Sequence, residues 1–226
     1  MEKNFHKEEM NYGVFTTSDI ASILNHSTRT VSRYIKLYGD VRFGKVIFND
    51  TYTWEVDGIR AVNFYAFIEL AVFFLLRDKY GLSIREINEA RNTVASTLQT
   101  PYPLATSPIL TGGNKIFYEY LGEILRTDKK NKNQVTIKSI VKPLLDKIEF
   151  DDGNIAKRYY PLGKNAEVVI DPSHQFGQPT IKGTNIRTET LWKLYKKGET
   201  TEALQAQYEL SAKQVGDAID FYKQAA

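Results

Sequence analysis

The feature that most constrains the fold is a long apolar run from Ala61 to Leu76, in which Glu69 is the one charged residue. A helix that crosses a membrane needs about 20 consecutive apolar residues, which is more than this run contains. A helix that is apolar on every side must be covered by other parts of the chain. We therefore expect a buried helix from Ala61 to Lys79, ended by Gly81, and no membrane span.

Composition narrows the class of protein. The 226 residues are 42% hydrophobic and 25% charged, which is typical of a soluble globular protein with one or two domains. The chain contains no cysteine, and this excludes disulfides, thiol nucleophiles and zinc sites built on thiolates. The segment from Met1 to Met10 is polar and charged, so we expect no secretory signal and a cytoplasmic protein.

Two short helices joined by a tight turn are predicted near the N-terminus. Thr17 or Ser18 is expected to cap the first helix, and its apolar stripe follows helical spacing: Ile20, Ile23 and Leu24. Residues 25–27, Asn-His-Ser, favour a turn. The second helix is predicted from Thr28 to Tyr38.

The second helix has one basic face. At roughly 100° per residue, three basic side chains fall within about 60° of one another: Arg29, Arg33 and Lys36. The apolar residues on the opposite side are Val31, Ile35 and Tyr38. Such a helix packs its apolar side on the first helix and presents cations to a partner or to solvent. An ordinary amphipathic helix with a solvated basic face is the alternative.

The basic face has the chemistry of a DNA-recognition helix. Arginine reads guanine in the major groove, while lysine and hydroxyl groups bind phosphates. The net charge of the whole chain is only +3, so the positive charge is local rather than general. The candidate DNA contacts are Thr28, Arg29, Thr30, Ser32, Arg33, Lys36, Arg42 and Lys45.

The N-terminal part resembles the winged helix-turn-helix of MerR-like regulators. The similar segments are residues 15–21, Phe-Thr-Thr-Ser-Asp-Ile-Ala, and residues 27–34, Ser-Thr-Arg-Thr-Val-Ser-Arg-Tyr. Residues 81–87 resemble the start of the second helical pair in that group and contain a capping-box pattern, Ser83 with Glu86. The resemblance implies binding to double-stranded operator DNA as a dimer. The expected wing, Val41 to Asp57, has no clear signature of the group.

Residues 112–162 are predicted to form a small β-containing middle subdomain. The segments Lys115 to Leu125 and Gln134 to Ile137 are rich in β-forming residues, and residues 127–133 between them are polar. A short helix is expected from Val141 to Ile148. A turn at residues 151–153 precedes a strand from Ile155 to Tyr160.

Residues 163–226 are predicted to form a separate three-helix module that is helix-turn-helix-like. A short strand at residues 168–170 precedes helices from Thr188 to Lys197, from Thr200 to Tyr208, and after a capping box at residues 211–214. The apolar stripe of the last helix is Val215, Ala218, Ile219 and Tyr222. Its charged residues, Lys213, Asp217, Asp220 and Lys223, sum to zero, so phosphate binding is not favoured there.

This module resembles the domain of unknown function 433, found in VapB-type antitoxins. The pattern consists of Asp171-Pro172, the segment 177–184, and Ile186, Thr190, Gly198, Tyr208 and Leu210. The resemblance implies an antitoxin that represses its own operon and neutralises a toxin with a PIN or PIN-like ribonuclease fold. Exposed aromatic residues are typical anchors of protein interfaces. The candidate partner contacts are Trp192, Tyr195, Tyr208 and Phe221, with a simple core role as the alternative for Trp192 and Phe221.

No enzyme motif is found. His6, His26 and His174 are scattered, and no metalloprotease, nucleophile-elbow or dinucleotide pattern occurs, so we expect no catalytic residues, cofactor or metal. The alternatives are a stand-alone MerR-like regulator whose C-terminal domain binds an effector or partner and, from another class, a metal-dependent nuclease.

The predicted fold class is mainly α with short β elements. The predicted domains are 11–111, a winged helix-turn-helix; 112–162, the middle subdomain; and 163–226, the antitoxin-type module. Because a recognition helix covers few base pairs, we expect a homodimer. The aromatic residues of the long apolar helix exceed the obvious needs of one small domain and are predicted to supply the dimer contact: Phe64, Tyr65, Phe67, Phe73 and Phe74.

Overall fold

The computed structural model describes residues 13–39, 53–56, 58–106, 142–144 and 146–224. It has α-helices and short antiparallel strands, which confirms the predicted α+β class. The helices are α1 (Thr17–Leu24), α2 (Thr28–Gly39), α4 (Phe64–Tyr80), α5 (Ile84–Leu98), α9 (Thr188–Lys196), α10 (Thr201–Tyr208) and α11 (Ala212–Lys223). The strands are β1 (Phe15–Thr16), β2 (Thr53–Val56), β3 (Ile59–Val62), β4 (Ile148–Phe150), β5 (Ala156–Tyr159), β6 (Val168–Val169) and β7 (Thr180–Ile181).

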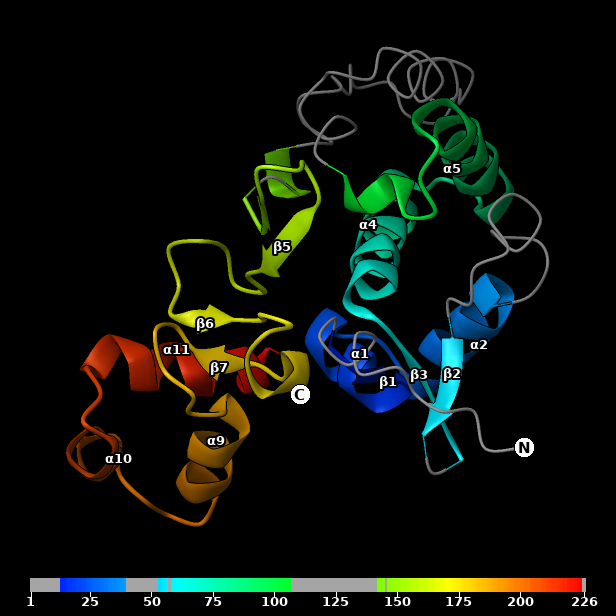
Figure 1. Cartoon of the computed structure of the whole chain (residues 1–226). Helices are drawn as coiled ribbons and strands as arrows, with labels where there is room; N and C mark the ends of the chain where they lie inside the picture. Colours follow the sequence, from blue (N-terminus) through cyan, green and yellow to red (C-terminus); the bar gives the residue numbers. More distant parts are fainter. Residues whose placement is uncertain (1–12, 40–52, 57, 107–141, 145, 225–226) are drawn as a thin grey trace.

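Helix α4 is the centre of the N-terminal half (Figure 1). The prediction of a buried helix is confirmed, as is its end at Gly81, which adopts the left-handed conformation that glycine favours. Its predicted start at Ala61 is wrong. Ala61 and Val62 belong to β3, and the side chain of Asn63 caps the helix by accepting the backbone N–H of Ala66.

The aromatic side chains of α4 point into the chain's own core. Phe64 and Phe67 are fully buried, and Phe73 and Phe74 are almost so. Tyr65 is half-buried and packs against Tyr102. The prediction of a dimer contact is therefore wrong for the four phenylalanines, because their rings are already covered within the chain.

A buried ion pair joins α4 to α5. Glu69 and Arg91 are both inaccessible to solvent, with 2.7 Å between the carboxylate and the guanidinium Nε. The Leu104 backbone N–H donates to the second oxygen of Glu69, and Arg91 donates to the carbonyl of Pro101. Burial raises the pKa of Glu69, and the guanidinium opposes that change. Each buried charge is thus matched, which is the condition for keeping it in a core.

A three-stranded antiparallel sheet with strand order β1-β3-β2 lies beside α1 and α2. Strands β2 and β3 form a hairpin with a turn at Gly58. The predicted wing from Val41 to Asp57 therefore overlaps this hairpin at residues 53–56. Its remainder, with the expected contacts Arg42 and Lys45, lies outside the described residues.

Strands β4 and β5 connect the two halves of the chain. The predicted turn at residues 151–153 is confirmed, and the strand that follows it is β5. The helix expected from Val141 to Ile148 is wrong at its end, because Ile148 begins β4; residues 142–144 are helical. The β-rich segments expected at Lys115 to Leu125 and Gln134 to Ile137 lie outside the described residues.

The C-terminal module has the three predicted helices and a small core of its own. Strands β6 and β7 pair antiparallel beside α11. The core of the module consists of Ile181, Leu191, Leu204, Leu210, Val215, Ala218 and Ile219. The stripe predicted for the last helix is thus confirmed at Val215, Ala218 and Ile219, while Tyr222 is half-buried.

The module is not independent of the N-terminal half. Val168, Ile170 and Phe221 belong to the main core around α4 rather than to the core of the module. Gly177 lies against the ring of Phe15, where an added Cβ would come within 2.5 Å of the ring, and its φ of +83° also favours glycine. The Val14 N–H donates to the Phe176 carbonyl at the same contact.

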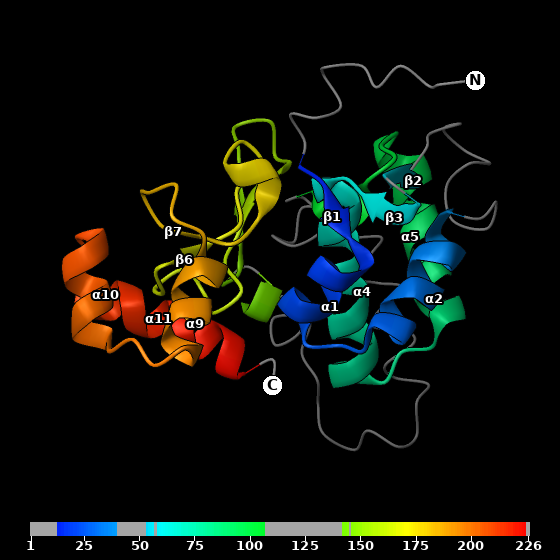
Figure 2. The ribbon, with the colours of Figure 1, turned by 90° about the horizontal axis from the view of Figure 1, so that it is seen from below.

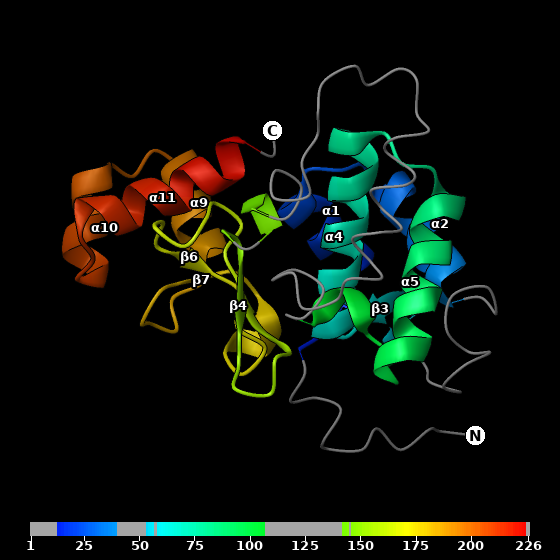
Figure 3. The same cartoon turned by 90° about the horizontal axis from the view of Figure 1, so that it is seen from above.

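The basic helix and the C-terminal helices lie on different sides of the molecule. Figures 2 and 3, which view it from opposite directions, both place α2 beyond α1 and α4 from helices α9, α10 and α11. The end of α11 lies beside α1 in both views.

Among the described residues, no helix is both long enough and apolar enough to span a bilayer.

Candidate functional site

Local sequence signals set the geometry of the α1–α2 pair. The cap of α1 is Thr16, not the predicted Thr17 or Ser18, because Thr16 and Asp19 form a reciprocal capping box. Helix α1 ends at Asn25, which adopts the left-handed conformation with φ of 54°. The hydroxyl of Ser27 then accepts the backbone N–H of Thr30 and caps α2.

The two faces of α2 are as the sequence predicts. Val31 and Ile35 are fully buried against the core, and Tyr34 is also buried. The exposed residues are Thr28, Arg29, Ser32, Arg33 and Lys36, while Thr30 is half-buried. The side chain of Tyr38 is not described. The structure thus brings together all the predicted DNA contacts that lie within the described residues.

The cations on this face are available to a ligand. Within the described ranges, Arg29 and Lys36 have no carboxylate partner. The guanidinium of Arg33 lies over the ring of Tyr34, 5.2 Å from its centroid, and close to its hydroxyl. This contact orients Arg33 without neutralising it.

The predicted aromatic contacts of the C-terminal module differ in exposure. Trp192 is half-buried and stacks on Tyr222 and Tyr195, and Tyr208 is also half-buried. Phe221 is only 4% exposed, so its predicted place at the surface is wrong. Its ring extends from α11 into the main core and contacts Tyr222 edge-on.

A further exposed aromatic was missed in the sequence. Phe176 is 60% exposed and lies in the 3₁₀ helix η3 (Gln175–Gly177), where Gln175 and Phe176 both have positive φ. Two consecutive non-glycine residues in this conformation are strained, and such strain gathers at functional segments. Phe176 carries no periodicity signal, because it does not belong to a regular helix or strand.

The motif around Asp171 has a structural role in this fold. Asp171 accepts hydrogen bonds from Ser173 and from Arg158, and Arg158 also pairs with Glu149. Although burial opposes it, these hydrogen bonds lower the pKa of Asp171. Burial and the nearby Glu149 raise the pKa of Tyr160 to about 12. The one guanidinium of this cluster thus contacts both of its carboxylates.

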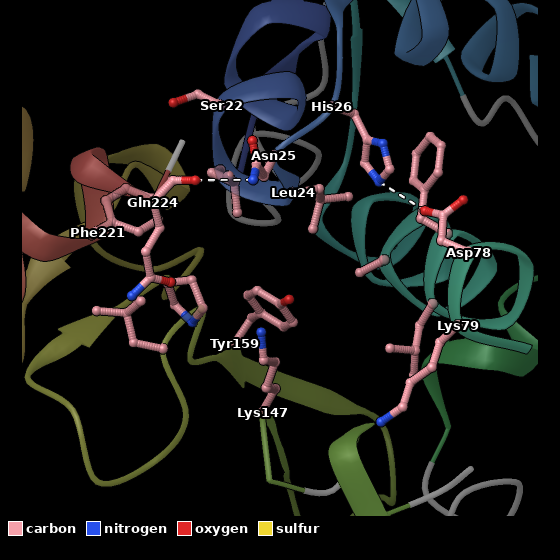
Figure 4. Close-up of a pocket in the computed structure, with 16 residues that line it drawn as sticks. Ser22, Leu24, Asn25, His26, Asp78, Lys79, Lys147, Tyr159, Phe221 and Gln224 are labelled. Atoms are coloured by element: carbon pink, nitrogen blue, oxygen red, sulfur yellow. Dashed lines mark hydrogen bonds and ion pairs between the residues drawn. The ribbon is translucent and has the colours of Figure 1, made fainter. Parts of the chain in front are cut away.

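A cavity of about 260 Å³ lies where the N-terminal half meets the C-terminal module (Figure 4). On one side, His26 stacks on Phe74 with 4.1 Å between ring centroids, and its Nε2 lies 3.2 Å from the carboxylate of Asp78. On the other side, the Asn25 amide donates to the Gln224 carbonyl. Burial lowers the pKa of His26, and Asp78 opposes this change in part.

The C-terminal module has a known family. Residues 168–222 match the family described as "Protein of unknown function (DUF433)". The match covers strands β6 and β7 and the three helices α9, α10 and α11. The predicted resemblance of this module is thereby confirmed.

Relatives extend the similarity beyond the C-terminal module. The chain is 30% identical over 168 residues to "Uncharacterized protein Rv2308" of Mycobacterium tuberculosis, which covers 70% of this chain and 69% of that protein. The chain therefore belongs to the same family as Rv2308. It is also 30% identical over 131 residues to "Putative antitoxin VapB45" of that organism, over 53% of this chain and 55% of that protein. The chain thus matches little more than half the length of VapB45.

The fold also occurs in a solved structure. The X-ray crystal structure of Rv2018 from Mycobacterium tuberculosis superposes with a TM-score of 0.69 and 23% sequence identity. The similarity covers 91% of this chain and 96% of that chain. The two proteins therefore share the arrangement of both halves, and at this identity the likeness concerns the fold alone.

Proposed function

We propose that this protein is an antitoxin that binds operator DNA through α2 and a toxin protein through its C-terminal module. The observation that carries the DNA-binding part is the basic face of α2, where Arg29, Arg33 and Lys36 are exposed. The helix pair α1–α2 and the later β2–β3 hairpin, among the described residues, support the winged helix-turn-helix in this proposal. The chain then acts by binding and not as an enzyme.

The toxin-binding part of the proposal is supported by the relatives. Similarity to a protein named as a putative antitoxin and the DUF433 match both favour an antitoxin-like family. The proposed partner is a PIN or PIN-like ribonuclease. Its contact surface includes Phe176, Trp192, Tyr195 and Tyr208, which are four of the incompletely buried aromatic residues of the module. Because α2 lies on another side of the molecule, DNA and toxin can be bound together.

We also propose that the operator complex contains a homodimer, since one recognition helix covers few base pairs and two half-sites increase specificity. The dimer contact does not use the phenylalanine rings of α4, which are buried within one chain.

Two measurements test the proposal. In the first, fluorescence anisotropy with the promoter DNA of the operon compares the native chain with Arg29→Ala and Arg33→Ala, each expected to lose about 1–3 kcal/mol of operator binding. In the second, the chain is co-expressed with the adjacent reading frame and analysed by size-exclusion chromatography. Co-elution that is weakened by Phe176→Ala supports a toxin partner. DNA binding without any partner would instead support a stand-alone regulator.

A further inference from the structure

The cavity in Figure 4 is built by both halves of the chain. Helix α1 and the turn after it supply one wall, the C-terminal end of α4 supplies another, and the end of α11 closes a third. Lys147 and Tyr159, from the β4–β5 region, point into it from below in this view. Its position places a bound molecule in contact with the turn that precedes α2.

About half of the cavity wall is apolar. The apolar lining residues are Ile23, Leu24, Ala71, Phe74, Leu75, Pro161, Leu162 and Phe221. Small-molecule sites are commonly of this kind, with an apolar lining and a few polar groups that fix orientation. The volume of about 260 Å³ suits a small organic molecule with a flat or compact apolar body.

The polar groups that face the cavity from the β4–β5 region are both donors. The Lys147 ammonium and the Tyr159 hydroxyl have no hydrogen-bond partner in the part of the chain that the structure describes. Tyr159 is 5% exposed, and burial raises the pKa of its phenol, so the hydroxyl stays protonated. Burial also lowers the pKa of Lys147, as expected for a cation that lacks a counter-ion.

The remaining charges leave the cavity positive. Asp78 is the one carboxylate among the lining residues, and the imidazole of His26 already contacts it. Lys79 also lines the cavity, with its ammonium 5.7 Å from the centroid of the Tyr80 ring, and adds a second cation. Lys147 is half-buried and Tyr159 is nearly buried, so water reaches their polar groups only in part, and an anionic acceptor would satisfy both donors.

We propose that this cavity is a binding site for a small monocarboxylate with an apolar body. The carboxylate accepts hydrogen bonds from Lys147 and Tyr159, and the body packs against Phe74, Leu75 and Leu162. The proposal does not depend on DNA or toxin binding, because it rests on the cavity alone. If the proposed function also holds, the site is that of an effector that stabilises the contact between the two halves.

Isothermal titration calorimetry of the full chain with benzoate and phenylacetate tests the proposal. We expect saturable binding with a Kd of about 1 mM or lower. Benzamide, which has the same shape but no charge, is expected to bind at least about tenfold more weakly, because hydrogen bonds to charged groups are stronger. Equal binding of benzamide, or no binding of either carboxylate, would overturn the proposal.

Two variants locate the site without disturbing the fold. Lys147→Met removes a partly buried cation with no partner, so the chain is expected to keep or gain stability. Tyr159→Phe keeps the edge-on packing of the ring against Phe67. Each is expected to weaken benzoate binding about tenfold or more. Lys157→Met, at an exposed position of the same strand, is the matched control and should bind normally. Unchanged affinity in both Lys147→Met and Tyr159→Phe would contradict the proposed site.

Discussion

The helix pair α1–α2 and the helix pair α10–α11 have the same helix lengths and similar caps, but their exposed faces differ in charge. The first helix has 8 residues and the second has 12 in both pairs. Both first helices begin after a threonine cap and end at a left-handed residue, Asn25 or Glu209, with φ of 54°. Both second helices are capped by a serine, Ser27 or Ser211.

The corresponding positions of the two second helices agree inside the core and differ outside it. Val31 and Ile35 of α2 are buried, as are Val215 and Ile219 of α11 at the same helix positions. The surface positions that hold Arg29, Arg33 and Lys36 in α2 hold Lys213, Asp217 and Asp220 in α11. Lys213 is paired with Asp217 in α11, whereas the cations of α2 lack acidic partners among the described residues. One backbone arrangement thus supports two surfaces, and the charges decide the partner.

The largest expected effect comes from giving α2 the charges of α11. The double variant Arg33→Asp with Lys36→Asp is expected to lose about 3–6 kcal/mol of operator binding, because two contacts vanish and two anions face phosphates. Fluorescence anisotropy at fixed salt measures the loss. Lys193→Asp with Lys196→Asp on α9 changes the net charge equally and is the control. Equal losses in both double variants would show that total charge, and not the face of α2, determines binding.

Phe221→Ala tests the tie between the C-terminal helix pair and the main core. The ring is 4% exposed and packs in the core around α4, so its removal is expected to cost about 3–5 kcal/mol of unfolding free energy. Urea denaturation followed by circular dichroism measures this value. Phe176→Ala removes an exposed ring and is expected to change stability by less than about 0.5 kcal/mol. If Phe221→Ala cost as little as the control, the core position of this ring would be disproved.

The two serine caps offer a direct comparison of the pairs. Ser27→Ala and Ser211→Ala each remove one hydrogen bond to a helix N-terminus and are each expected to cost about 1 kcal/mol. The sites are far apart in the structure, so the double variant should add the two costs to within about 0.5 kcal/mol. Thermal unfolding of the three variants decides this. A clearly larger cost for one cap would mean that the pairs are not equivalent in stability.

The smallest expected effect is on the pH dependence of stability. His26 lies in the turn of the pair α1–α2, and the corresponding position in the pair α10–α11 is Leu210, which does not titrate. Burial lowers the pKa of His26 below its unfolded value of 6.5, so the unfolded chain binds the proton more tightly. His26 therefore favours folding most above pH 6.5, and stability decreases as the pH falls through that value. The imidazole is partly solvated, so we expect a change on the order of 0.5 kcal/mol. His26→Phe keeps the stacking on Phe74 and should remove this part of the pH dependence of urea unfolding; an unaltered dependence would exclude His26 as its source.

Periodic features of this fold were predictable, and tertiary contacts were not. The apolar run of α4, the basic face of α2 and the capping boxes at Ser83 and Ser211 follow from local spacing, and the structure has each of them. The start of α4 was not predictable from spacing alone. The apolar run begins at Ala61, but Ala61 and Val62 lie in β3, and the helix begins only after the cap at Asn63. Local spacing cannot tell that the ring of Phe221 enters a core formed by residues near the other end of the chain. Local spacing also could not predict that Lys147 and Tyr159 line one cavity, because that cavity is formed by residues far apart in the sequence.

The packing of Gly177 against the ring of Phe15 has a consequence for folding during synthesis on the ribosome. Phe15 is fully buried in the finished protein, yet part of its cover is a glycine near the other end of the chain. Because chains are synthesised at roughly 5–20 residues per second, Gly177 leaves the ribosome on the order of ten seconds or more after β1. During this interval the nascent N-terminal half leaves part of the Phe15 ring and the free edge of β1 uncovered, which is the kind of surface that chaperones recognise.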